Sequence, residues 1–386
     1  MGREQKDVRP IPERLAVADR LRIVICYPLV NAYMAACWRE LAARVGVDLF
    51  VIGFKPEAGD LVAFTTGIMA GVPSRLLAGA ERREAKVTAD LVGELRPDLL
   101  LISGWSEPAF RPLYADKRLK DVPKVLMMDN QLRRTLRQYV GRLALRPMLR
   151  HVDHFFVTGE RAWQYARFLG IGEDRIQRGA VSIDYKALAP IYDQRVAGLD
   201  GWPRSFFFAG RYHPRKAIDL MLDAYGRYRA RRPDAWPLVA AGMGPMAGAL
   251  AGREGVTDLG FVDPHAMPLH WRAAGVFVIP SRFDAWPLVI VEAAAAGLPI
   301  IASEACGSTV ENVRHFYNGL VIPTEDVGRL CDALLWMHDN GNRLPVMGAR
   351  SRSLAAAYGA DVWTDRVLDM AARLVPGKRA ASAGHL

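Results

Sequence analysis

Short apolar runs alternate along the chain with segments whose apolar residues recur every three or four positions. The runs predict strands of a parallel sheet, because strands covered on both faces are apolar throughout. The segments between them predict helices that pack on such a sheet. The predicted strands are Leu21–Cys26, Val47–Ile52, Asp98–Ile102, Val125–Met128, His154–Val157, Arg204–Ala209, Leu238–Ala241, Val276–Ile279, a run from Pro299, and Leu320–Ile322. Strands that alternate with helices indicate an α/β protein.

The length of the chain and one aperiodic segment predict two domains. A chain of 386 residues is long for a single hydrophobic core. Residues 182–202 lack clear periodicity and contain Pro190, so we expect the connection between domains there. The predicted domains are residues 1–185 and 200–360.

The stretch 280–303 carries the strongest chemical signal. It follows a predicted strand, opens into a loop with Asp284, and continues into an Ala-rich helix that contains Glu292. Open α/β sheets bind ligands at the carboxyl ends of their strands. Pro287 suits the first helical position, and the free N–H groups after it can hold an anion, usually phosphate.

Glu292 lies about a turn and a half into this helix, where it would meet a phosphate poorly. A carboxylate beside a phosphate site is better placed to accept hydrogen bonds from sugar hydroxyls. On spacing alone, an ordinary solvated glutamate on a helix remains an equal alternative.

Composition narrows the class of protein. The chain is 51% hydrophobic and 24% charged, as in globular proteins. No apolar run reaches about 18 residues, the length that a membrane span requires, and residues 1–10 lack the apolar core of a signal peptide. The four cysteines and eight histidines show no metal-like spacing, so we expect reduced thiols, no metal and a cytoplasmic location.

The net charge of +10 favours an anionic partner. Six arginines lie in the segment Arg133–Arg150, and no acid lies between Asp129 and Asp153. Apolar residues recur there at helical spacing from Leu132 to Leu143. A basic amphipathic helix of this kind can lie on an anionic bilayer, or it can be a surface helix whose apolar side packs on the sheet. We expect no nucleic acid, because no aromatic residues for stacking are interleaved.

The stretch 280–303 resembles the donor-site signature of retaining glycosyltransferases of the GT-B fold, family 4 (also called group 1). That signature has two acidic residues with seven residues between them, here Asp284 and Glu292, and the following Ala-Ala-Ala-Ala-Gly-Leu-Pro-Ile-Ile-Ala-Ser is close to its continuation. The resemblance is strongest over residues 206–334. It implies two Rossmann-like doubly wound domains that face each other across a cleft, with a carboxyl-terminal helix at 361–375 packed back on the first domain.

The resemblance also implies roles for individual residues. Arg211 and Lys216 would grip the donor diphosphate, whose charge grows as the glycosidic bond breaks. Together with Asp284, which would hold the transferred sugar, they are the residues implied for catalysis. The remaining implied donor contacts are Gly210 and Gly242 in turns, Phe261 and Val262 near the base, the N–H groups of Leu288 and Val289, and Glu292 on the ribose.

The implied reaction is retaining hexosyl transfer from a nucleotide-diphosphate sugar to a glycan or lipid-linked acceptor. A UDP-sugar is favoured, a GDP-sugar is the alternative, and no further cofactor is expected. Strand ends at 103–106 and 129–131 would lie on one sheet edge, which makes Trp105, Asp129 and Asn130 candidate acceptor contacts. Relatives of this kind build cell-surface polysaccharides and glycolipids. If the basic helix of this chain binds lipid, we expect a peripheral location on the inner face of the cell membrane.

Two departures from the family pattern stand out. Asp284 is one methylene shorter than the usual glutamate, and Pro287 stands where relatives often have glycine. Two other functions stay open: a nucleotide-sugar epimerase or hydrolase on the same fold, and a non-catalytic scaffold that binds a nucleotide sugar.

Overall fold

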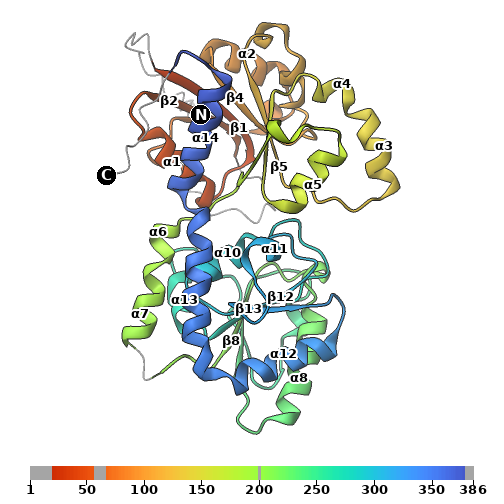
Figure 1. Cartoon of the computed structure of the whole chain (residues 1–386), viewed down its shortest axis with the longest axis vertical. Coiled ribbons are helices and arrows are strands. Elements are labelled where there is room, and N and C mark those ends of the chain that lie inside the picture. Colours follow the sequence, from red (N-terminus) through yellow and green to blue (C-terminus); the bar gives the residue numbers. More distant parts are fainter. Residues whose placement is uncertain (1–19, 56–66, 199–200, 379–386) are drawn as a thin grey trace, which may run out of the picture.

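Two parallel sheets organise the chain into two lobes (Figure 1). The computed structural model describes residues 20–55, 67–198 and 201–378, so the first 19 residues of the predicted first domain lie outside the described residues. The first sheet has the order β3-β2-β1-β4-β5-β6-β7, and the second has the order β10-β9-β8-β11-β12-β13. The predicted α/β class with two doubly wound parallel sheets is confirmed.

The strand bounds are as follows. The first sheet contains β1 Leu21–Leu29, β2 Val47–Phe54, β3 Ser74–Leu77, β4 Leu99–Ser103, β5 Lys124–Met128, β6 His154–Val157 and β7 Ile176–Arg178. The second contains β8 Phe206–Ala209, β9 Leu238–Ala241, β10 Val256–Asp258, β11 Val276–Ile279, β12 Ile300–Ser303 and β13 Gly319–Ile322.

The helices cover both faces of each sheet. Their bounds are α1 Ala32–Ala42, α2 Ala85–Leu95, α3 Leu136–Ala144, α4 Arg146–Leu149, α5 Glu160–Phe168, α6 Tyr185–Leu188, α7 Pro190–Gly198, α8 Ile218–Arg231, α9 Met267–Ala273, α10 Leu288–Ala295, α11 Thr309–Asn312, α12 Val327–Asp339, α13 Leu344–Ala355 and α14 Ala360–Leu374.

Alternate residues of each central strand enter different cores. In β1, Ile23 and Ile25 belong to one buried cluster, whereas Val24 and Cys26 belong to the cluster on the opposite face. All four are at most 2% exposed. A strand that is buried on both faces has no polar side, which is why the sequence shows continuous apolar runs rather than alternation.

The segment between the lobes is more ordered than its sequence predicts, because it contains α6 and α7. Arg195 on α7 is 1% exposed, and its guanidinium lies 5.0 Å from the centre of the Trp202 ring. A buried cation is stable only when its donors are satisfied. Here they reach the carbonyl oxygens of Trp271, Arg272, Ala296 and Gly297.

The basic segment forms a shorter helix than predicted. Arg134 has φ 52°, outside the helical region, so α3 begins at Leu136 rather than at Leu132. None of the α3 residues is buried. The hypothesis that its apolar side packs on the sheet is therefore wrong. The exposed fractions are 80% for Leu136, 59% for Val140 and 63% for Leu143.

The carboxyl-terminal helix α14 lies in the first lobe beside α1 (Figure 1). Trp363 on α14 is completely buried in the cluster that contains Phe156. Its indole N–H donates to the carbonyl oxygen of Ala180 at 3.0 Å. The chain therefore crosses back and attaches its carboxyl-terminal helix to the amino-terminal sheet.

We expect Trp363→Ala to lower the free energy of unfolding of the first lobe by about 3 to 5 kcal/mol, because it empties a large site in a core that cannot fully collapse. Urea titration followed by far-ultraviolet circular dichroism measures the change. Val346→Ala, at a half-exposed position of α13, is the control. An unchanged midpoint for Trp363→Ala would show that α14 contributes little to that lobe.

Candidate functional site

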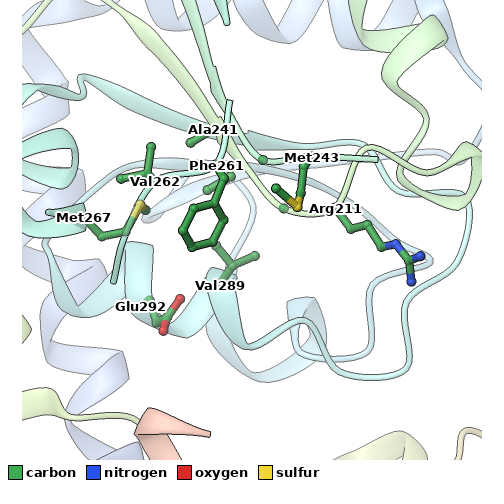
Figure 2. A pocket seen from close by; sticks show the side chains of 11 residues that line it. Arg211, Ala241, Met243, Phe261, Val262, Met267, Val289 and Glu292 are labelled. Carbon is green, nitrogen blue, oxygen red and sulfur yellow. The ribbon is translucent and has the colours of Figure 1, made fainter. Parts of the chain in front are cut away.

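Loops at the carboxyl ends of strands β8 and β9 meet the first half of α10 around a cavity of about 330 Å³. Figure 2 shows Phe261 and Val289 between Glu292 and Arg211. The lining residues are Ala209, Gly210, Arg211, Ala241, Gly242, Met243, Phe261, Val262, Met267, Val289 and Glu292. The structure thus gathers most of the residues that the sequence assigned to a donor site. The sequence did not point to the side chains of Met243 or Met267 as part of the lining.

Two glycines allow the β8 and β9 loops to approach each other. A Cβ atom at Gly242 would lie 1.9 Å from the carbonyl oxygen of Gly210, and one at Gly244 would lie 2.3 Å from that of Tyr212. Any side chain at either position would push the loops apart. The Gly-x-Gly pattern therefore reflects a close backbone contact at the wall of the cavity.

Lys216 and Asp284 form an ion pair beside the cavity, from Nζ to Oδ2. Each side chain is 19% exposed. Neither residue lines the 330 Å³ cavity, but the pair joins the loop after β8 to the loop after β11. The carboxylate compensates the charge of this partly buried cation.

Arg282 is a site residue that the sequence analysis missed. Its guanidinium donates to both carboxylate oxygens of Asp219 and to the carbonyl oxygen of Pro214, each at 2.8 Å. Its backbone N–H donates to the carbonyl oxygen of Arg215 at 2.8 Å. The paired guanidinium holds the pKa of Asp219 below its usual range. Arg282 thus fixes the Lys216 loop against the Asp284 loop.

Helix α10 presents its first turn and Glu292 to the cleft. Pro287 precedes the helix rather than occupying its first position as predicted, and Leu288 and Val289 supply first-turn N–H groups that have no partner within the helix. Burial raises the pKa of Glu292 to about 7. Burial, together with the charge of the Glu292 carboxylate, also raises the pKa of Tyr33 on α1, so Glu292 lies close to the first lobe.

A second cavity of about 250 Å³ lies between the lobes, next to the first one. Asp129 and Asn130 line it from the first lobe, and Leu288 lines it from α10. Burial raises the pKa of Asp129, and the charge of Asp284 raises it further. The two carboxylates therefore lie near each other across the cleft.

Trp105, the third candidate acceptor residue, is not among the described residues that line this cavity. Its ring lies 6.2 Å from that of Tyr165, and it packs against the core of the first lobe. The end of β4 places the backbone of Trp105 at the expected edge of the sheet, but its side chain packs toward the core.

The sequence matches known proteins in the region that forms this site. Residues 203–340 match the family model described as glycosyl transferases group 1. The chain is 28% identical over 240 residues to D-inositol 3-phosphate glycosyltransferase 1 of Catenulispora acidiphila, with 58% of this chain and 57% of that protein covered. It is 29% identical over 275 residues to the lipopolysaccharide core biosynthesis mannosyltransferase LpsB of Rhizobium meliloti, with 64% and 76% covered. These matches support a group 1 glycosyltransferase.

The fold of the chain is GT-B. The Anabaena protein HepE, whose crystal structure is in complex with UDP and glucose, superposes with a TM-score of 0.69 at 16% identity. The alignment covers 92% of this chain and all of that one. By contrast, the match to the Catenulispora relative spans less than three fifths of that protein's length.

Within the described ranges, no helix has the length and apolar character needed to cross a bilayer. The same part of the chain contains no group of three or more His, Cys, Asp or Glu side chains placed to hold a metal ion.

The raised pKa of Glu292 makes stability depend on pH. Between about 4.5, the ordinary pKa of the group, and about 7, the folded carboxyl binds a proton that the unfolded one has released. Stability from this group is therefore present at low pH and lost as pH rises toward 7. In this pH window, we expect the free energy of unfolding of wild type to fall, relative to that of Glu292→Gln, by up to about 1.4 kcal/mol per pH unit.

Urea unfolding at a series of pH values measures this difference. The exposed Glu304→Gln variant is the matched control and should parallel wild type throughout. If the urea midpoints of wild type and Glu292→Gln differ by the same amount at every pH from 5 to 7.5, the raised pKa is contradicted.

Proposed function

We propose that the chain transfers a hexose from a nucleotide-diphosphate sugar to an acceptor held across the cleft. The observation that carries this proposal is the Lys216–Asp284 pair at an edge of the second lobe that also has a cavity lined by Glu292 and that faces Asp129 of the first lobe across a second cavity. A cation, a sugar-binding carboxylate and a second pocket are what a two-substrate transfer requires. The family match over residues 203–340 supports the same reaction.

Each residue of the site has a task in this reaction. Arg211 and Lys216 bind the diphosphate and stabilise the charge that develops on it as the glycosidic bond breaks. A diphosphate competes with Asp284 for Lys216, which frees the carboxylate to accept hydrogen bonds from the sugar. Glu292 accepts bonds from the ribose, and the first-turn N–H groups of α10 bind a phosphate.

The proposed stereochemical course is retention. The leaving phosphate takes the acceptor proton on the same face of the sugar, so that no enzyme nucleophile is needed. A UDP-sugar is the favoured donor, because the structure of HepE holds UDP and glucose, with a GDP-sugar as the alternative. The name of the Rhizobium relative supports a glycan or lipid-linked acceptor in the biosynthesis of cell-surface polysaccharide or glycolipid.

Product analysis separates this function from its two alternatives. An epimerase or hydrolase would convert the donor, or release free sugar, without an acceptor. A non-catalytic scaffold would retain its cellular role when Asp284 and Lys216 are both replaced by alanine.

We expect Lys216→Ala to lower kcat by about 10²- to 10³-fold, because it removes a preorganised cation from the leaving group. Release of UDP from UDP-glucose, or of GDP from GDP-mannose, measures turnover with a mixture of glycan and lipid acceptors. Arg215→Ala is the matched control, since it removes an exposed cation from the same loop. Equal loss of turnover in both variants would argue against a specific diphosphate contact.

We also propose that α3 docks on an anionic bilayer. The stripe of Leu136, Val140 and Leu143 is exposed, and arginines surround it without any acid between Asp129 and Asp153. Apolar side chains that enter the headgroup region, flanked by cations, fit this one partner. Such a surface would bring the cleft close to a lipid-linked acceptor.

Vesicle co-sedimentation tests this docking. Wild type should bind phosphatidylcholine vesicles that contain phosphatidylglycerol, and salt should release it. Each arginine near the surface contributes about 1 kcal/mol, so Arg137→Glu with Arg146→Glu should abolish binding, and Val140→Ser should weaken it. Arg83→Glu, on another exposed surface of the first lobe, should bind as wild type does. Retention that is unaffected by the paired reversal would contradict the proposal.

A further inference from the structure

The side chain of Gln131 crosses from the first lobe to the loop that carries Asp284. Its amide nitrogen donates to the carbonyl oxygens of Asp284 at 2.5 Å and of Ala285 at 2.6 Å. Its amide oxygen accepts from Arg161 at 3.2 Å. Both amide hydrogens are used, and the residue is only 7% exposed. No motif in the sequence pointed to it.

Other contacts between the lobes surround this one. Arg161 also donates to the carbonyl oxygen of Glu304 in the second lobe, so one guanidinium supports Gln131 and reaches past it. The backbone N–H of Glu160 donates to the carboxylate of Glu311 at 2.5 Å. A Cβ at Gly159 would lie 2.3 Å from that carboxylate, so the lobes meet closely here. Gln131 thus lies within a packed seam rather than on a loose surface.

The loop around Asp284 is held from both lobes. The backbone carbonyl oxygen of Asp284 accepts from the N–H of Gly307 in the second lobe at 3.0 Å and from the Gln131 amide in the first lobe. The Gln131 amide also donates to the carbonyl oxygen of Ala285. Together these bonds fix the orientation of the peptide between Asp284 and Ala285. That peptide adjoins the Cα of Asp284, so its orientation sets the direction in which the carboxylate leaves the backbone.

The segment behind Gln131 is ordered as well. Gln138 on α3 donates to the backbone carbonyl oxygen of Gln131 at 2.7 Å and accepts from the N–H of Arg133 at 2.7 Å. The guanidinium of Arg133 lies 4.5 Å from the centre of the Phe283 ring in the second lobe. The start of the basic segment therefore faces the donor loop, and Arg133 is part of the seam rather than of the exposed stripe.

We propose that Gln131 is a positioning residue that makes the placement of the Asp284 carboxylate depend on contact between the lobes. This inference rests on the proposed transferase function, in which Asp284 holds the sugar. When the lobes separate, Gln131 leaves, and the peptide after Asp284 loses the restraint that orients it. Nucleotide binding uses groups of the second lobe and does not need Gln131, whereas transfer does.

Gln131→Ala and Gln131→Glu test this role, because glutamate keeps the size of the side chain but supplies no donor for the two carbonyls. Gln164→Ala, an exposed glutamine on α5, is the matched control. We expect both Gln131 variants to lower kcat by about 10- to 100-fold, since a misplaced group near the reacting atoms costs rate. The dissociation constant for UDP, or for GDP if that nucleotide stabilises wild type, should stay unchanged. A loss of thermal stability with unchanged kcat would overturn the proposal.

A second measurement stands apart from turnover. Spin labels at Val45 and Val346, which are exposed on different lobes, report the distance between the lobes by electron paramagnetic resonance. Gln131→Ala should broaden the distance distribution, and Gln164→Ala should not. If wild type transfers no sugar, the proposed function is wrong. If the distance distribution of Gln131→Ala is as narrow as that of wild type, the proposed role of Gln131 between the lobes is wrong.

Discussion

Parallel strands place every loop between a strand and its following helix at one edge of the sheet, and this constraint governs the whole molecule. The carboxyl ends of β1, β4 and β5 in the first lobe, with the residues that follow β4 and β5, line the same cavity as Trp286 and Leu288 in the second lobe, where α10 begins at Leu288. The functional edges of the two sheets therefore face each other. The strands are apolar because they are buried on both faces, so the polar and charged candidate residues lie in the loops that follow them.

Two cations at this edge are paired with carboxylates. Lys216 is paired with Asp284, and Arg282 is paired with Asp219. A loop that brings a cation into a partly buried cleft is stable only if that cation has a partner. The partner of Lys216 is itself a candidate sugar ligand, so one ion pair both stabilises the two loops and holds two candidate binding groups together. The raised pKa of Glu292 reflects the same cost, because here no cation offsets burial.

The sequence was sufficient for elements whose signal is local. Continuous apolar runs located the central strands, and the spacing of Asp284 and Glu292 located the loop and helix of the second sheet. Residues that act on distant backbone carbonyls were missed. Gln131, Arg195 and Arg282 all donate to carbonyl oxygens far away in the sequence, and a carbonyl has no side-chain identity that a pattern could record.

Helix α3 has no buried residue, whereas α5 and α7, which have the same length, each have at least two. Nine residues form a marginal helix in water unless one face is buried, and none of its residues is buried. The contacts that hold it include the bond from Gln138 to Gln131 near its beginning and the contacts of Tyr139 and Arg142 with the Phe168 ring, at 5.1 and 5.4 Å. The order of α3 and the position of Gln131 are therefore linked. A ligand that binds only the ordered helix must, by reciprocity, favour the seam between the lobes by the same free energy. On this argument, an anionic bilayer under α3 would do more than localise the protein, because it would also favour the arrangement in which Gln131 holds the Asp284 loop.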